Sequence, residues 1–205
     1  MTETLHHPFD LSGGNLALDF ANTVSKRPTS APIERLKDYR YLVAFGRASG
    51  AYGPLTAVDR LFPLPGRSPE RGEAALESAI QLREAIFAIF SAVARRRQVP
   101  RDSLALLNAY VQTSAENARL VQEGGRFQWQ WMGMDSAFES VLWPIARAAA
   151  DLLVSEELTH LRICASDECD WLFLDKTKNQ RRRWCDMKTC GNRVKARRHY
   201  QRLKA

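Results

Sequence analysis

Four cysteines constrain this chain more than any other feature of its sequence. They are Cys164, Cys169, Cys185 and Cys190, and the first 163 residues contain none. The spacing is one C-x4-C pair, fifteen intervening residues and a second C-x4-C pair. Two close pairs on separate turns are what a tetrahedral four-thiolate zinc site requires, and reduced thiols suit metal better than disulfides. The spacing predicts a structural Zn²⁺ site, with unmetallated core thiols as the alternative.

The rest of the composition is that of an ordinary globular chain. Its 205 residues are 45% hydrophobic and 26% charged, enough for one core, or one domain with a small appendage. No run approaches the roughly 18 uncharged apolar residues of a membrane span, and the first eight residues do not resemble a secretory signal. We therefore expect a cytoplasmic protein. Without a phosphate loop, a nucleophile elbow or an HExxH motif, we do not expect an enzyme.

Charge is distributed unevenly along the chain. Residues 1–175 carry 18 Lys and Arg against 22 Asp and Glu, whereas residues 176–205 carry 12 against 1, so the net charges are −4 and +11. A concentrated positive charge favours a polyanion partner, because neutralising phosphates releases condensed counterions. A disordered solubilising tail is the alternative.

The segment around the cysteines has the layout of a treble-clef zinc finger. Residues 171–175 and 181–184 are predicted to form a hairpin between the ligand pairs, with a polar turn at 176–180. A helix at 194–203 follows the last cysteine. Its stripe of Ala196, Tyr200 and Leu203 is predicted to face the hairpin. Trp184 and Tyr200 are expected to pack there, the alternative being that they stack on unpaired bases.

Two motifs carry a family resemblance. The run from Cys190 to Arg193 spells CGNR and, with Phe173-Leu-Asp175 and Arg183-Trp184-Cys185, closely resembles the CGNR zinc finger of bacterial proteins over residues 161–203. The run from Gly14 to Val24 resembles the opening of the ABATE domain, which precedes that finger in the family. The resemblance implies an ABATE-like domain at 1–158 and a CGNR finger at 159–205. It also implies a stress-induced transcriptional regulator that binds DNA through the finger and a small-molecule ligand through the N-terminal domain.

Carried onto this sequence, the resemblance makes the four cysteines the zinc ligands and places Arg193 in the named motif. Four thiolates leave no open coordination position, so the metal would be structural. Zinc contributes on the order of 10–16 kcal/mol to small fingers, and we expect this finger to unfold without it.

Basic residues of the finger are the candidate nucleic-acid contacts. Arg182 must point away from its two neighbours on an extended strand, whereas the helical residues form a broad basic face. The sequence predicts phosphate binding to DNA, and leaves RNA or an acidic protein surface as alternative partners. Oxidation of the thiolates is a further possible regulatory input. No heptad seam is visible, so the oligomeric state stays open. The predicted contacts are Arg181, Arg182, Arg183, Arg193, Lys195, Arg197, Arg198 and Arg202.

The N-terminal region is predicted to be mainly helical with a small β-sheet, which makes the chain an α+β protein. Alternation of Leu16, Leu18 and Phe20 with smaller or polar residues predicts a strand. The remaining predicted elements are helices at 34–45, 70–95, 103–121 and 136–154, and a strand at 127–131.

A ligand pocket in this region is predicted to involve Asp19 and Asn22 near Trp129 and Trp131. Polar groups among aromatic rings orient small molecules in apolar clefts. The alternatives are that Asp19 caps a helix or anchors a turn, and that the tryptophans pack against helices.

Overall fold

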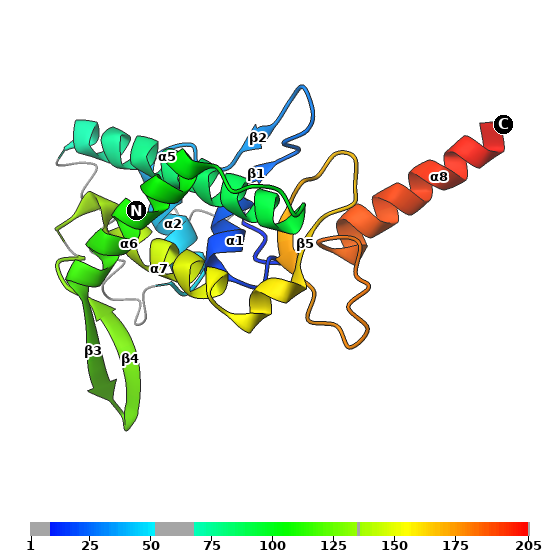
Figure 1. Ribbon diagram of the computed structural model, residues 1–205. Coiled ribbons are helices and arrows are strands. Elements are labelled where there is room, and N and C mark those ends of the chain that lie inside the picture. The colour runs from blue at the N-terminus through cyan, green and yellow to red at the C-terminus, as the bar shows by residue number, and fades with distance from the viewer. Residues whose placement is uncertain (1–8, 52–67, 135, 205) are drawn as a thin grey trace.

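The computed structural model describes residues 9–51, 68–134 and 136–204 of the chain and shows a helical body from which two elements project (Figure 1). The body combines long helices with short antiparallel strand pairs. Its helical elements are α1 (Leu16–Ala21), α2 (Tyr39–Ala48), α5 (Pro69–Ala94), α6 (Arg101–Asn117), the 3₁₀ turn η1 (Phe138–Val141), α7 (Leu142–Leu153) and the 3₁₀ turn η2 (Glu156–His160). Together with the small sheets, these helices bear out the mixed α and β class.

Helix α1 lies where the sequence predicted a strand, and that prediction was wrong. The Oδ1 of Asn15 accepts a hydrogen bond from the backbone N–H of Ala17 at 2.9 Å, which caps the helix. Ala17, Leu18 and Phe20 are all fully buried. A short helix that is enclosed on nearly every side has no polar face, so its sequence does not show the helical period.

Helix α5 matches its predicted range, but the other three helices predicted in the N-terminal region have different ends. The helix predicted at 136–154 begins as the 3₁₀ turn η1 and becomes an α-helix, α7, only at Leu142. The 34–45 prediction was too early, because Asp38 accepts hydrogen bonds from the N–H groups of Arg40 and Tyr41 and starts α2 there. Ile33–Glu34 instead forms strand β2, which pairs with β1 (Val24–Ser25).

Helix α6 ends at Asn117, earlier than predicted, because the next residues enter a hairpin. Strand β3 (Ala118–Glu123) pairs with β4 (Arg126–Trp131) through Gly124 and Gly125, which both have positive φ angles of 56° and 78°. The predicted strand at 127–131 is confirmed. The hairpin projects from the body at the end far from the C-terminus (Figure 1).

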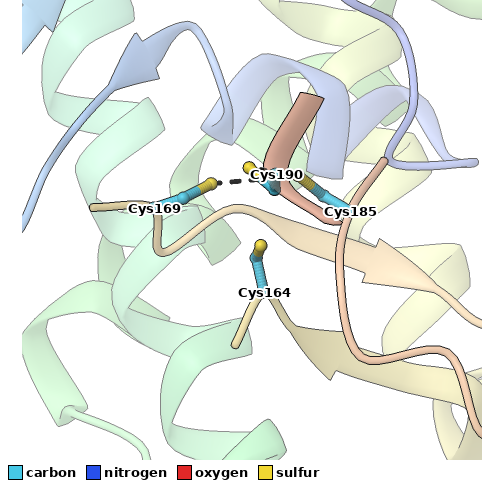
Figure 2. A group of neighbouring side chains, drawn as sticks. All are labelled: Cys164, Cys169, Cys185 and Cys190. Atoms are coloured by element: carbon cyan, nitrogen blue, oxygen red, sulfur yellow. Dashed lines mark hydrogen bonds between the residues drawn. The ribbon is translucent and has the colours of Figure 1, made fainter. Parts of the chain in front are cut away.

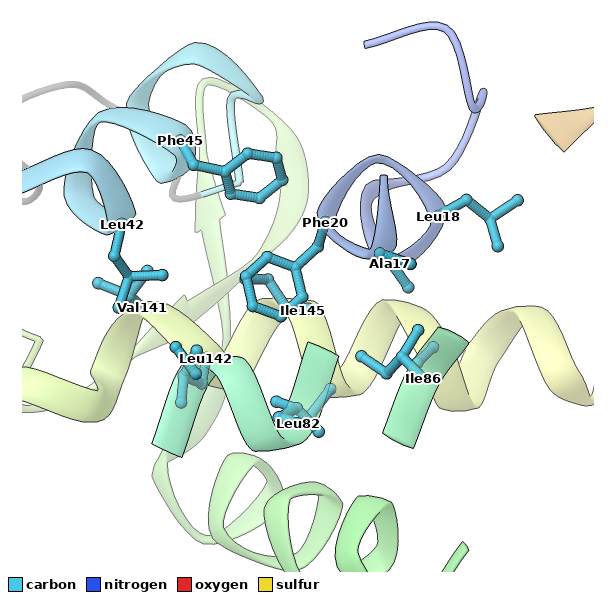
Figure 3. Packing of buried hydrophobic residues seen from close by; sticks show 14 of the residues in the cluster. Ala17, Leu18, Phe20, Leu42, Phe45, Leu82, Ile86, Val141, Leu142 and Ile145 are labelled. Atoms are coloured by element: carbon cyan, nitrogen blue, oxygen red, sulfur yellow. The ribbon is translucent and has the colours of Figure 1, made fainter. Parts of the chain in front are cut away.

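The main core lies where α1, α2, α5 and α7 meet (Figure 3). The rings of Phe20 and Phe45 are 5.4 Å apart between centroids. Leu82 and Ile86 of α5 and Ile145 of α7 are fully buried in the same cluster. This core fixes α1, which in turn contacts the cysteine-rich segment.

In the cysteine-rich segment the predicted hairpin was wrong. Strand β6 (Leu172–Leu174) pairs with β5 (Leu161–Ile163), so the first cysteine pair lies in the turn between these two strands. Residues 181–184 form no strand; the N–H of Arg182 donates instead to the Asp175 carboxylate at 2.8 Å. Asp175 also accepts from Thr177, so the intervening loop folds around a buried carboxylate that sequence patterns do not reveal.

The two faces of β6 belong to two different clusters. Leu172 and Leu174 pack into the main core, whereas Phe173 and the preceding Trp171 pack with the cysteines. Alternate side chains point to opposite faces of a strand, so three residues are enough for this. Strand β6 therefore packs against the main core on one face and against the cysteine cluster on the other.

After the last cysteine, the π-helical turn η3 (Met187–Gly191) leads into α8 (Asn192–Lys204). The predicted helix is confirmed, but its predicted packing was wrong: Tyr200 is 65% exposed and Leu203 is 70% exposed. The helix extends outward from the body to the C-terminus instead of lying on a hairpin (Figure 1). Among the described helices, none is long and apolar enough to cross a membrane.

Candidate metal centre

The first cysteine pair lies in a tight turn between β5 and β6. The N–H of Cys164 donates to the carbonyl of Trp171 at 2.9 Å, and the N–H of Cys169 donates to the carbonyl of Ser166 at 2.9 Å. These bonds close the turn and direct both sulfur atoms to its inner side (Figure 2).

The second pair brackets the turn that begins α8. Asp186 accepts a hydrogen bond from the N–H of Thr189 at 2.7 Å and caps this turn, which carries Cys190. A Cβ atom at position 191 would overlap the sulfur at the end of the exposed Met187 side chain and lie 3.4 Å from the Trp184 ring, so a larger residue there would require Met187 to move.

All four sulfur atoms converge on one point (Figure 2). They lie within 4.8 Å of one another and all four residues are buried. The Cys169–Cys185 and Cys185–Cys190 sulfur pairs are 3.8 and 3.7 Å apart. Zn–S bonds of about 2.3 Å in a tetrahedron place sulfur atoms roughly 3.8 Å apart, so the donor set fits Zn²⁺.

Mutual contacts also perturb the thiols. Hydrogen bonds from the three neighbouring thiols lower the pKa of Cys164, whereas thiol contacts raise the pKa of Cys169 and of Cys185. Four thiolates at these separations repel one another unless a cation lies between them. A divalent metal therefore has both the geometry and an electrostatic reason to occupy the cluster.

Aromatic side chains enclose the sulfur atoms. Trp171 and Phe173 are buried beside them, and Trp184 is half-buried against the same cluster, as predicted. The indole N–H of Trp171 donates to the carbonyl of Val24 at 2.9 Å, which connects the wall of the centre to the N-terminal region.

The predicted basic residues divide into two groups. Arg182 is half-buried: its Nε donates to the Trp184 carbonyl at 2.9 Å and its guanidinium lies 4.7 Å from the Phe173 ring centroid. The Arg182 guanidinium is thus engaged within the loop itself, which it helps to stabilise. The other seven are exposed or, for Arg198, placed in α8: Arg181, Arg183, Arg193, Lys195, Arg197, Arg198 and Arg202.

One acidic residue near the centre was not predicted. Glu168 lies between the first two cysteines, and its carboxylate is 3.6 Å from both Arg193 and Arg197. These side chains come from different turns of the segment, so no spacing rule in the sequence would have paired them.

The four residues of the predicted ligand pocket are not brought together. The Asp19 carboxylate accepts from the N–H of Gly13 at 2.7 Å, as a turn anchor would, while Asn22 bonds the backbone of Leu172. Trp129 and Trp131 lie on the β3–β4 hairpin, which points away from α1 (Figure 1). Trp131 packs instead against the main core, where its indole N–H donates to the Ser114 hydroxyl of α6 at 3.2 Å.

The model of ABATE, described as "Putative stress-induced transcription regulator", matches residues 14–156. The chain belongs to the ABATE family. A second model, the CGNR zinc finger, matches residues 160–203 and includes all four cysteines. The ABATE and CGNR matches confirm the resemblance and, with the sulfur cluster, support structural zinc. Neither is an enzyme family, and a search of curated proteins gave no match.

Proposed function

We propose that this ABATE protein is a DNA-binding transcriptional regulator in which a structural zinc finger presents α8 to the duplex. Zinc would be held by Cys164, Cys169, Cys185 and Cys190 in a treble-clef arrangement, and its role would be to fix the start of α8. Ligand binding by the N-terminal region and a role in stress stay predictions.

The exposed helix α8 is the observation that supports this function best. An isolated 13-residue helix is marginal in water, and α8 contributes little apolar surface to either cluster. Its exposed Arg193, Lys195, Arg197 and Arg202 distribute positive charge around an element narrow enough for a major groove. A cationic helix held away from its own body is suited to a polyanion.

The experiment is a fluorescence-anisotropy titration of the full-length, zinc-loaded protein with random duplex DNA and with single-stranded RNA at several salt concentrations. Tight duplex binding is expected, with log Kd depending on log salt by about 0.9 per neutralised phosphate. A variant with Lys195→Gln and Arg202→Gln should lose about 1.8 of that slope, because two phosphate contacts are removed.

A matched control removes two exposed cations elsewhere on the protein. Arg119→Gln with Arg126→Gln alters the β3–β4 hairpin, far from α8 in Figure 1, and should leave the slope unchanged. Tighter binding of the single-stranded RNA than of the duplex DNA would indicate that the partner is RNA. Absence of binding to either nucleic acid would overturn the proposal and favour an acidic protein partner.

A further inference from the structure

A second basic cluster lies outside the finger, at the C-terminal end of α5. Arg95, Arg96 and Arg97 follow this helix consecutively and are all exposed. They are on a defined turn: Arg96 has a φ of 53°, and the N–H of Arg97 donates to the carbonyl of Ala92 at 2.8 Å. The backbone of this turn therefore holds three exposed arginine residues next to one another on the surface.

This turn lies beside the finger. The Arg95 guanidinium is 3.5 Å from the carboxylate of Asp170, which directly follows Cys169. Helix α5 also contacts both β5 and β6. The ribbon shows the end of α5 next to β5, on the side of the body from which α8 extends (Figure 1).

The first cysteine turn thus has cations on both sides. Glu168, two residues before Asp170, pairs with Arg193 and Arg197 of α8. Glu168 and Asp170 are at most about 7 Å apart along the chain. The two basic clusters that pair with them are therefore close enough to contact phosphates only a few positions apart on one nucleic acid. Glu168 and Asp170 are partly neutralised by these ion pairs, and Asp167, which precedes Glu168, is the remaining exposed carboxylate of the turn.

A structural role accounts for Arg95 but not for its neighbours. Within the described residues, the side chains of Arg96 and Arg97 form neither an ion pair nor a hydrogen bond. Three adjacent guanidinium groups repel one another, and an arginine side chain can form a bidentate pair with a phosphate. The cluster therefore suits a polyanion that reaches it from the finger.

We propose that the Arg95–Arg97 turn contacts the phosphate backbone of the same nucleic acid that α8 binds, so that the binding surface spans both family regions. This inference rests on the proposed function. Arg95 would position the turn through Asp170, and Arg96 and Arg97 would contact phosphates. The N-terminal region would then add to affinity directly, without contributing base recognition.

The test uses the full-length zinc-loaded protein and a variant with Arg96→Gln and Arg97→Gln, in which the Arg95–Asp170 pair is intact. The salt slope for random duplex DNA should fall by about 1.8, because two phosphates are no longer neutralised. Lysine at both positions should retain the slope. The hairpin variant with Arg119→Gln and Arg126→Gln is the control for a loss of two charges at a distance.

The outcomes separate this inference from the proposed function. Wild-type binding with an unchanged slope in the Arg96→Gln, Arg97→Gln variant overturns the inference and leaves the finger as the DNA-binding element. An equal loss of slope in the hairpin control overturns it too, because the effect would then reflect net charge alone. If the wild-type protein fails to bind, both proposals are wrong.

Discussion

At the scale of single residues, Asp19 is the most perturbed carboxylate of the N-terminal region. It is 8% exposed, and burial together with the nearby Asp10 raises the pKa of Asp19 to about 7, although the N–H of Gly13 opposes the shift. A Cβ atom on Gly13 would lie 2.8 Å from the same carboxylate oxygen, so this turn also requires glycine. The buried carboxylate anchors the turn that leads into α1. Its raised pKa means that the free energy needed to keep it buried increases with pH.

Replacing Asp19 by asparagine tests that cost. The pKa of Asp19 is about 7 in the folded chain against 3.8 for an ordinary aspartate, so the native state binds more protons between these values. Its contribution to stability must therefore fall as pH rises from about 4 to 7. The amide oxygen in the Asp19→Asn variant can still accept from Gly13 without titrating. This variant should be more stable than wild type at pH 8 by up to about 4 kcal/mol.

Urea unfolding of both proteins at pH 4, 6 and 8 measures this difference directly. The stability gap between wild type and Asp19→Asn should widen with pH. A gap that is constant across the series would show that Asp19 has the same pKa in the folded and unfolded chain.

At the scale of elements, α1 and β6 are joined by one side chain. The amide of Asn22 donates to the carbonyl of Leu172 at 2.8 Å and accepts from its N–H at 2.9 Å, so a single asparagine pairs like an extra strand residue. Both groups are buried, and leaving either unpaired costs about 1–3 kcal/mol.

Asn22→Ala should therefore lower the free energy of unfolding by about 2–6 kcal/mol, because two buried backbone groups lose their partners. Chemical denaturation measures this loss. Asn108→Ala on the exposed side of α6 is the control and should change stability by less than about 0.5 kcal/mol. Equal small effects in the two variants would mean that water replaces the Asn22 amide.

The elements also show what the sequence could predict. Local sequence patterns are sufficient to predict α5, β4 and the four-cysteine cluster, because each depends on residues that are close together in the sequence. The partner of β6 was not predictable, since it depends on Asp175 drawing residues 177–182 into a loop and on Asn22 holding β6 from a distance. The predicted packing of Tyr200 was wrong because the apolar stripe of α8 is exposed instead of lying on a hairpin.

At the scale of the whole molecule, the metal centre and the main core are not independent. Leu161, Leu172 and Leu174 belong to the core of the N-terminal region, although they come from the segment that holds the cysteines. Removing zinc should therefore destabilise α1 and α5 as well as the finger.

Hydrogen exchange with and without a chelator tests this coupling. Amides of α1 should exchange faster in the chelated protein, and added Zn²⁺ should restore their protection. Thermal unfolding should remain one transition that shifts to lower temperature. Two separate transitions, with α1 protected throughout, would contradict a shared core.

The shape of α8 has a mechanical consequence. Its ion pairs with Glu168 involve Arg193 and Arg197 in its first half, and its 13 residues extend about 20 Å from the sulfur cluster. A helix held only over its first half acts as a lever whose pivot is at its N-terminal end. A rotation of about 10° at this end would move the other end of the helix by roughly 3.5 Å. Small adjustments at its first turn would thus be magnified at its C-terminal end.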